Sequence, residues 1–414
     1  MLDHPVGRTL KRLFDANDFP WLLPLPPWAC ARDRQVRRIR RAGRTALRRQ
    51  QVAERGWGAV LAAAAVWPAV ALLKAGLDAR SAPPLHRSRL LSLLDAWWLQ
   101  IAHNLRLADQ HYFRLEIPAQ RRQVRRFVTD GENKTLLMYV NRDLPSRNIG
   151  DKRPFAEFCA RHRLPTVPVL TTCAGGGAAP EPLASWPAGE LFFKPATGWG
   201  GEGAAILRPD SACGTWTCDR TTGITPDTIA AFARARVGGA AWLLQPRLTN
   251  GPDWAAFTPG DCALATVRVV TGRILPTGPV QLLAGFMRFP LRSSTVDNLS
   301  AGGLGSDYDI ATGRLHRARK FDPGSPLYTH HPDTAAPIEG AVIPRWDEIA
   351  ALARRAHEPL TEIATVGWDV ALPAAGPILL EANPNWGVPL DTALGDTPYV
   401  DYLLQPAVAS RFPC

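Results

Sequence analysis

The stretch of the chain that most constrains its fold is LFFKPATGWGGEGAAIL, at residues 191–207. Two apolar runs flank four glycines, so the pattern predicts two strands joined by a flexible turn. Gly198, Gly200 and Gly203 fit G-x-G-x-x-G, but the continuation AAILRPD is strand-like, whereas a helix follows a dinucleotide-binding turn. Lys194 precedes the glycines, which argues against a Walker P-loop, and the chain lacks the HRD and DFG elements of protein kinases.

Two interpretations of this glycine-rich segment remain. It is either an ordinary hairpin tip or a flap that folds over a triphosphate, because glycine lets backbone N–H groups approach phosphate oxygens closely. In the second case Lys194, which ends the first strand, meets the phosphate charge. Lysine is scarce in this chain, with six residues against a majority of arginines, and Lys152 opens a second segment of the same kind. These two lysines favour the flap.

Candidate metal ligands follow near the C-terminus, in GWDVALPAAGPILLEANPNWG. The pattern predicts a β-hairpin with Asp369 on one strand and with Glu381 and Asn383 on the other. Residues two apart face the same side of a strand, and Asp369 can lie opposite them. Two carboxylates and an amide oxygen are hard ligands suited to Mg2+. The alternative is a solvated acidic face, but uncompensated charge among these apolar residues would be costly, which favours a metal.

Length and pattern predict more than one domain and the α+β class. Residues 1–107 form a mostly helical, arginine-rich region, and from about residue 111 short strands alternate with helices. TLLMYV, at residues 135–140, has the composition of a strand. We predict two further units, at residues 108–245 with the glycine-rich flap and at residues 246–414 with the metal site.

Charge and cysteine content limit the partners and the compartment. The formal net charge of +11 favours anionic partners. Ten arginines and only two acidic residues lie between Ala31 and Arg55, without interleaved stacking aromatics, which argues against nucleic acid. The seven cysteines show neither a disulfide framework nor a metal-binding spacing, and the first residues lack the pattern of a secretory signal. We therefore expect a cytoplasmic protein.

Two apolar segments occur in the N-terminal region. GAVLAAAAVWPAVALL, at residues 58–73, is shorter than a membrane-spanning helix and contains Pro68, so we expect a buried core helix. The alternative is an interfacial anchor, in which residues 31–74 contact anionic lipid at the inner membrane face. LLSLLDAWWLQIAHNL, at residues 90–105, predicts an amphipathic helix whose paired tryptophans lie in the core.

The ordered set of segments resembles the ATP-grasp superfamily, in particular its sugar-transfer-associated branch, over about residues 108–404. DKRPFAEFCARHRL resembles the first lysine segment of that family, and LFFKPATGWGGEGAAIL resembles the second lysine and its flap. WLLQPRL is similar to the hinge strand beside adenine, with glutamine where many members carry an acidic residue. ATVRVVT resembles the strand with the phosphate-binding arginine, and VDNLSAGGLGSDYD resembles the acceptor loop. The resemblance implies two α+β subdomains that clasp ATP.

The resemblance also implies a role for each matching residue. Lys152 and Lys194 would bind the nucleotide phosphates, with Arg268 at the transferred phosphate. The other implied positions are Gly200, Gly201 and Gly203 over the phosphates, Gln245 and Arg247 beside the base, Asp253 at the ribose, Asp297, Asn298, Gly302 and Gly303 at the acceptor, and Asp369, Glu381 and Asn383 on Mg2+.

By this resemblance the chain would be an ATP- and Mg2+-dependent, ADP-forming ligase. A small-molecule carboxylate would accept the γ-phosphoryl group, and an amine would then attack the acyl phosphate and form an amide. The branch suggests a sugar or amino-acid conjugate as substrate. Two alternatives stay open: a kinase of the same fold that phosphorylates a hydroxyl, and a membrane-associated protein that binds ATP without catalysis. The residues near Asp297 and Asn298 do not separate ligase from kinase.

Overall fold

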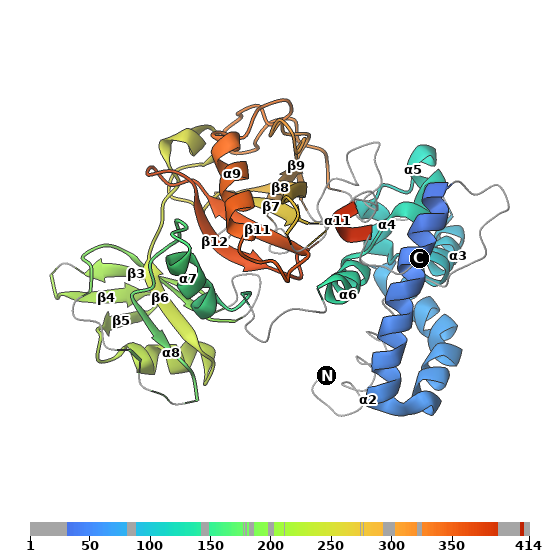
Figure 1. Cartoon of the computed structure of the whole chain (residues 1–414), viewed down its shortest axis with the longest axis horizontal. Coiled ribbons are helices and arrows are strands. Elements are labelled where there is room, and N and C mark those ends of the chain that lie inside the picture. Colours follow the sequence, from blue (N-terminus) through green and yellow to red (C-terminus); the bar gives the residue numbers. More distant parts are fainter. Residues whose placement is uncertain are drawn as a thin grey trace.

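A computed structural model gives the fold of the chain. It describes residues 31–80, 88–141, 149–176, 178, 180–181, 186–197, 203–210, 212–273, 275, 277–292, 303–320, 325–387 and 406–409. Two antiparallel sheets lie beside each other, and a group of helices occupies the end of the molecule away from the first sheet (Figure 1). The predicted α+β class is therefore confirmed.

The first sheet contains the flap strands and has the order β1-β6-β2-β3-β4-β5. Its strands are β1 (Thr171–Cys173), β2 (Leu191–Pro195), β3 (Ala205–Asp210), β4 (Thr215–Cys218), β5 (Thr221–Ile224) and β6 (Trp242–Pro246). Helix α8 (Ile229–Val237) packs on it through Phe232, whose ring centroid lies 5.4 Å from that of Phe193. The alternating burial of β2 is the period expected for a strand with one face in the core.

The second sheet contains the predicted hairpin and has the order β10-β9-β8-β7-β11-β12. Its strands are β7 (Thr266–Gly272), β8 (Gln281–Phe289), β9 (Leu304–Asp307), β10 (Arg319–Lys320), β11 (Thr365–Ala371) and β12 (Ile378–Asn383). Helix α9 (Trp346–His357) covers one face, and a short 3-10 helix, η2 (Pro252–Phe257), joins the same core. Helix α7 (Lys152–Arg161) also packs on this core through Phe155 and Phe158, although it precedes β1 in the chain (Figure 1).

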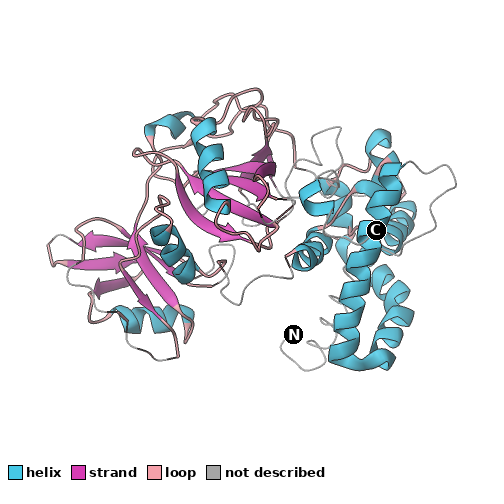
Figure 2. Ribbon diagram, in the orientation of Figure 1, coloured by secondary structure: helices cyan, strands magenta, loops and turns pink. Residues whose placement is uncertain are grey.

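The N-terminal region is helical, as predicted (Figure 2). Its elements are α2 (Ala31–Asp78), α3 (Arg89–His103), α4 (Leu107–Tyr112), α5 (Pro118–Arg122), η1 (Val124–Arg126) and α6 (Asp130–Val140), and a short helix near the C-terminus, α11 (Pro406–Ala409), packs against the same group. The predicted boundaries at residues 107 and 245 stay predictions.

The predicted strand at residues 135–140 is wrong, because these residues end helix α6. Thr129 caps the helix by accepting a hydrogen bond from the Glu132 N–H at 3.2 Å. Asn133 and Asn141 lie eight residues apart on one helical face, and both bind the chain that follows β12. The apolar composition of the segment resembles a strand, whereas its capping residue and its tertiary hydrogen bonds favour the helix.

The predicted core helix at residues 58–73 is helical, but its outer face is not buried. Leu61 is 63% exposed and Leu73 is 55% exposed, whereas Trp67 and Ala71 on the opposite face are buried. The two adjacent tryptophans differ in burial, because Trp97 packs inward whereas Trp98 is 50% exposed. These helices therefore expose apolar surface that sequence periodicity assigned to a core.

Candidate active site

The predicted metal ligands and the predicted arginine lie in one row across the second sheet. Glu381 on β12 is directly opposite Asp369 on β11, and Asp369 is directly opposite Arg268 on β7. Directly opposed residues of antiparallel strands share a face, so these three side chains project to the same side. Asn383 lies two residues beyond Glu381 on β12 and therefore joins this face.

Asp369 is held by two arginines. Arg268 donates to both carboxylate oxygens, through Nε to Oδ1 and through Nη2 to Oδ2 at 2.9 Å. Arg288 on β8 places Nη2 2.6 Å from Oδ2. Burial by itself would raise the pKa of Asp369, but the charges of Arg268 and Arg288 hold it well below its ordinary value. Asp369 is therefore ionised at every physiological pH.

The pKa of Glu381 shifts in the opposite direction, above its ordinary value. Burial and the neighbouring negative charge of Asp369 raise the pKa of Glu381. Asn383 donates from Nδ2 to Glu381 Oε1 at 3.1 Å, and Lys152 Nζ lies 3.8 Å from Oε2. Two carboxylates that face each other on neighbouring strands repel, and a divalent cation placed between them would offset this repulsion.

The two predicted phosphate-binding lysines come from different elements, and their charges influence each other. Lys152 opens helix α7, which Asp151 caps by accepting from the Arg153 N–H at 2.9 Å. Lys194 is the fourth residue of β2. Burial and the nearby positive charge of Lys152 lower the pKa of Lys194 to about 8, against the opposing effect of Glu381. The docking of α7 on the second sheet thus brings Lys152 to the row of β12, β11 and β7, and the Lys152 N–H donates to the carbonyl oxygen of Ala196, just after β2, at 3.3 Å.

The charges of this cluster favour an anionic ligand. Four cationic side chains surround two carboxylates, which leaves an excess of two positive charges in a largely buried place. The six residues are Lys152, Lys194, Arg268, Arg288, Asp369 and Glu381. Uncompensated charge is costly when it is removed from water, and a polyphosphate would neutralise it.

The residues also fit Mg2+. Asp369, Glu381 and Asn383 supply hard oxygen donors on one face of the sheet, and a cation bound by these donors would offset the repulsion between the two carboxyl groups. In the part of the chain that the structure describes, no group of three or more His, Cys, Asp or Glu side chains could hold a metal. A cation here would thus need further ligands, which is typical of Mg2+ bound together with phosphates.

Part of the predicted flap lies outside the described residues, including Gly200 and Gly201. Gly203, where the flap returns to β3, has φ of +75°, and a Cβ there would lie 2.9 Å from Val237 Cγ1. The side chain of Arg236 on α8 donates to the carbonyl oxygens of Gly203 at 3.1 Å and Ala204 at 2.9 Å. The end of the flap is therefore fixed to α8, and glycine is required at its last position.

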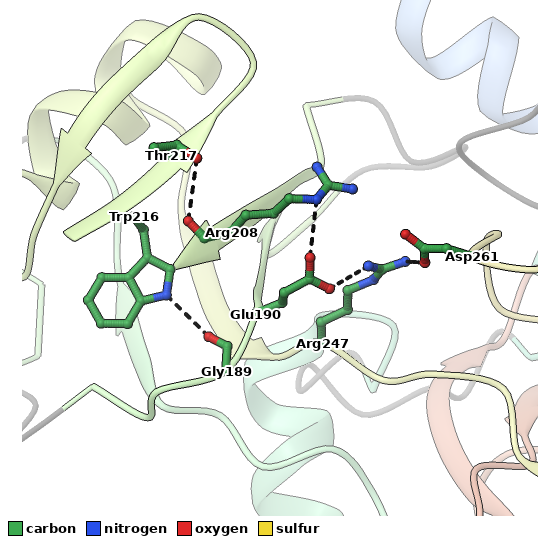
Figure 3. Close-up of polar contacts among 7 residues, drawn as sticks. All are labelled: Gly189, Glu190, Arg208, Trp216, Thr217, Arg247 and Asp261. Carbon is green, nitrogen blue, oxygen red and sulfur yellow. Dashed lines mark hydrogen bonds and ion pairs between the residues drawn. The ribbon is translucent and has the colours of Figure 1, made fainter. Parts of the chain in front are cut away.

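The predicted base-binding residues lie at the junction of the two sheets. Arg247 follows β6 and bridges two carboxylates, Glu190 and Asp261, while Arg208 Nε contacts Glu190 at 3.1 Å (Figure 3). Gln245 is buried on β6 and donates to the Val167 carbonyl oxygen at 3.1 Å. Asp253 lies exposed in the first turn of η2. Contact of these residues with a nucleotide stays a prediction.

The predicted acceptor loop is mostly outside the described residues. Asp297, Asn298 and Gly302 belong to this part, whereas Gly303 is buried immediately before β9. Their proposed role stays a prediction. Strand β9 ends in Asp307, which is buried and contacts His316 Nδ1 at 2.7 Å.

Sequence reasoning missed Arg288 and Phe286. The Cζ atoms of Arg268 and Arg288 lie 5.6 Å and 5.8 Å from the Phe286 ring centroid, and Phe286 is directly opposite Arg268. The ring therefore supports both guanidinium groups near Asp369. The alternation of Phe286 and Arg288 along GFMRF indicated a shared face, but only the strand register shows that this face carries Asp369.

The family described as sugar-transfer associated ATP-grasp matches residues 132–397, which is well over half of the 414 residues. No curated protein sequence matches the chain significantly.

Solved structures show distant likeness. D-alanyl-alanine synthetase A from Vibrio cholerae O1 biovar eltor is 13% identical, with TM-score 0.34 over 64% of this chain and 66% of that one. Biotin carboxylase from Campylobacter jejuni is 10% identical, with TM-score 0.36 over 64% and 46%. L-amino acid ligase from Bacillus licheniformis is 12% identical, with TM-score 0.31 over 57% and 41%. The chain thus spans less than two thirds of the length of each of these proteins. The family match is what assigns the chain: it belongs to the sugar-transfer associated ATP-grasp family, within a superfamily of ATP-dependent ligases that typically use Mg2+.

Proposed function

We propose that the protein is a carboxylate-amine ligase that consumes ATP with Mg2+ and forms an amide through an acyl phosphate. Its substrates would be small molecules, with a sugar or amino-acid conjugate as the carboxylate. The observation that carries the proposal is the excess of positive charge around Asp369 and Glu381, supplied by Lys152, Lys194 and two arginines.

The proposed reaction has two steps. A carboxylate oxygen of the substrate bonds to the γ-phosphorus while the bond to the β-phosphate oxygen breaks, and ADP leaves. The amine nitrogen then bonds to the acyl carbon, phosphate leaves, and the amine loses a proton. Both steps develop negative charge on phosphate oxygens, and fixed cations stabilise such charge without rearrangement.

Each group of residues would have a separate role in this reaction. Lys152 and Lys194 would bind the terminal phosphates, and Arg268 would contact the transferred group after releasing part of its hold on Asp369. Asp369, Glu381 and Asn383 would hold Mg2+, which neutralises phosphate charge when bound. The glycine-rich flap would exclude water from the acyl phosphate, which hydrolyses readily.

A hydroxylamine trap tests the proposal. The protein is incubated with Mg-ATP, hydroxylamine and pooled carboxylates, including amino acids and uronic acids, and ADP and hydroxamate are measured together. We expect both products in equal amounts. ADP that depends on an added alcohol, without hydroxamate, would contradict the ligase and favour the kinase. Nucleotide binding without ADP from any pool would instead favour a protein that binds ATP without catalysis.

A matched pair of variants tests the metal site. Glu381→Gln keeps the shape of the side chain but removes its charge, and we expect turnover to fall by about 10²-fold or more. Glu339→Gln removes a surface carboxylate that lies 3.7 Å from Arg317, and turnover should stay unchanged. Equal turnover in the two variants would contradict the assignment of Glu381.

A further inference from the structure

Helix α2 consists of two arms rather than one straight rod. Gly56 has φ of 77° and ψ of 160°, which are not helical values, and it separates a basic arm at residues 31–55 from an apolar arm at residues 57–78. In a straight helix Arg40 and Trp67 would be about 40 Å apart. Trp67 instead packs with Ile101 near the end of α3, and Arg40 donates to the carbonyl oxygen of Phe127, which packs in one cluster with Leu99 of α3. The chain therefore reverses direction at Gly56.

The apolar arm and α3 expose most of the large hydrophobic side chains at the surface. Among the described residues thirteen such side chains are exposed, and ten belong to these two helices. They are Trp57, Leu61, Val66, Leu72, Leu73, Leu77, Leu90, Leu91, Leu94 and Trp98. Scattered exposed hydrophobic residues are ordinary, but this concentration on two neighbouring helices marks a contact surface.

The outer face of the apolar arm carries no charge. Lys74 and Asp78 are the only charged residues between 57 and 78. Lys74 Nζ lies 5.3 Å from the centroid of the buried Trp67 ring, and Asp78 pairs with Arg106 Nε at 3.9 Å. Because both charges are directed to partners within the helical region, the exposed face is apolar along its whole length.

This surface is adjacent to positive charge. Arg48, Arg49 and Arg55 are exposed on the basic arm, close in sequence to Gly56 where the apolar arm begins. An apolar face bordered by arginines is typical of helices that lie in the boundary between lipid headgroups and acyl chains. The same arginines would oppose pairing with a second copy, because two basic arms would meet.

The contacts of the two arms define how the chain would meet a bilayer. By length and composition the helix is able to cross a membrane, and only 17% of its most apolar window is buried. However, the basic arm is joined to the folded protein by Arg40, which binds Glu132 through Nε at 2.6 Å. The end of α3 is also joined to it, because Leu99 packs in one cluster with Phe286 of β8. The basic arm and the end of α3 are therefore both held by the folded protein, so both lie on the same side of a bilayer.

We propose that the apolar arm and α3 form a monotopic anchor in an anionic phospholipid bilayer. The exposed hydrophobic side chains enter the interfacial region, and the arginines of the basic arm contact lipid phosphates. The anchor fixes the catalytic site at the membrane surface, since the cluster around Leu99 includes Phe286, which supports Arg268 and Arg288.

Vesicle flotation with the full chain tests this anchor. We expect binding to vesicles of phosphatidylcholine and phosphatidylglycerol at 3:1, and much weaker binding to phosphatidylcholine alone. Leu61→Glu combined with Leu73→Glu should weaken partitioning about 100-fold, at about tenfold for each side chain. Arg48→Gln combined with Arg49→Gln should weaken only the binding to anionic vesicles, about fivefold for each arginine.

A matched control separates the anchor from general hydrophobicity. Leu275 is 61% exposed, almost as much as Leu61, but lies outside α2 and α3. Leu275→Glu should leave vesicle binding unchanged, and all variants should keep the circular dichroism of the wild type because the substituted side chains are exposed. Failure of the wild type to float would overturn the proposal. A dimer in solution that Leu61→Glu dissociates, without vesicle binding, would overturn it in favour of self-association.

Discussion

The lowered pKa of Lys194 predicts that nucleotide affinity depends on pH above neutrality. Burial and the charge of Lys152 lower this pKa to about 8, so the ammonium form is present below pH 8 and is lost as the pH rises through that value. A triphosphate binds the ammonium form. The protonated fraction is about 0.9 at pH 7 and about 0.1 at pH 9, so ATP affinity should fall about tenfold between these values, or about 1.4 kcal/mol.

Isothermal titration calorimetry with Mg-ATP, or with a nonhydrolysable analogue, measures this effect. If Lys194 is protonated in the complex, binding at pH 9 takes up close to one proton, and the observed enthalpy then varies with the ionisation enthalpy of the buffer. Lys194→Arg provides the control, because the guanidinium stays charged throughout this range. Its affinity should be nearly independent of pH, since the arginine keeps its positive charge.

Two results would refute the reasoning. A wild-type affinity that is the same at pH 7 and pH 9 would mean that Lys194 does not contact the nucleotide, or that its pKa is not lowered. An equal decrease in Lys194→Arg would assign the titration to another group. Either result would remove the pH dependence as support for Lys194 in the proposed phosphate site, without affecting the membrane anchor.

Two further substitutions probe the stability of the site. Asp369→Asn leaves Arg268 and Arg288 without their shared counter-charge, so it should lower the free energy of unfolding by about 3–5 kcal/mol in chemical denaturation. The surface variant Glu339→Gln should change this free energy by less than about 1 kcal/mol. Equal effects of the two substitutions would show that Asp369 is not coupled to the two arginines. Gly203→Ala and Gly214→Ala both place a side chain at positive φ, but only the Cβ at position 203 meets a neighbouring atom, Val237 Cγ1 at 2.9 Å. Gly203→Ala should therefore lower the free energy of unfolding by about 1 kcal/mol or more beyond Gly214→Ala, and it alone should weaken ATP binding.

Helix α6 shows how the N-terminal region contributes to the site. Asn141 accepts from the N–H groups of Ala364 and Thr365, both at 3.1 Å, and donates to the carbonyl oxygen of Pro384 at 2.9 Å. Ala364 lies immediately before β11, Thr365 is the first residue of β11, and Pro384 follows β12. One amide side chain therefore links the two ends of the hairpin that carries Asp369 and Glu381. The helical region therefore holds the candidate metal ligands in register.

Local sequence patterns determined those features that depend on side-chain direction along one element. Glu381 and Asn383 share a face because the period of a strand is two residues. The position of Lys194 next to the glycines predicts a phosphate flap, which stays a prediction. The ordered motifs were sufficient to predict the family and the α+β class, both of which are confirmed.

Tertiary structure decided what depends on contacts between distant segments. Arg288 reaches Asp369 only because β7 lies between β8 and β11, and Lys152 reaches Glu381 only because α7 packs on the second sheet. Residues 135–140 have strand-like composition, yet they form a helix whose asparagines bind the hairpin. The apolar run after Gly56 is helical, as its composition indicates, but whether it is buried depends on what packs against it, and no local pattern encodes that partner.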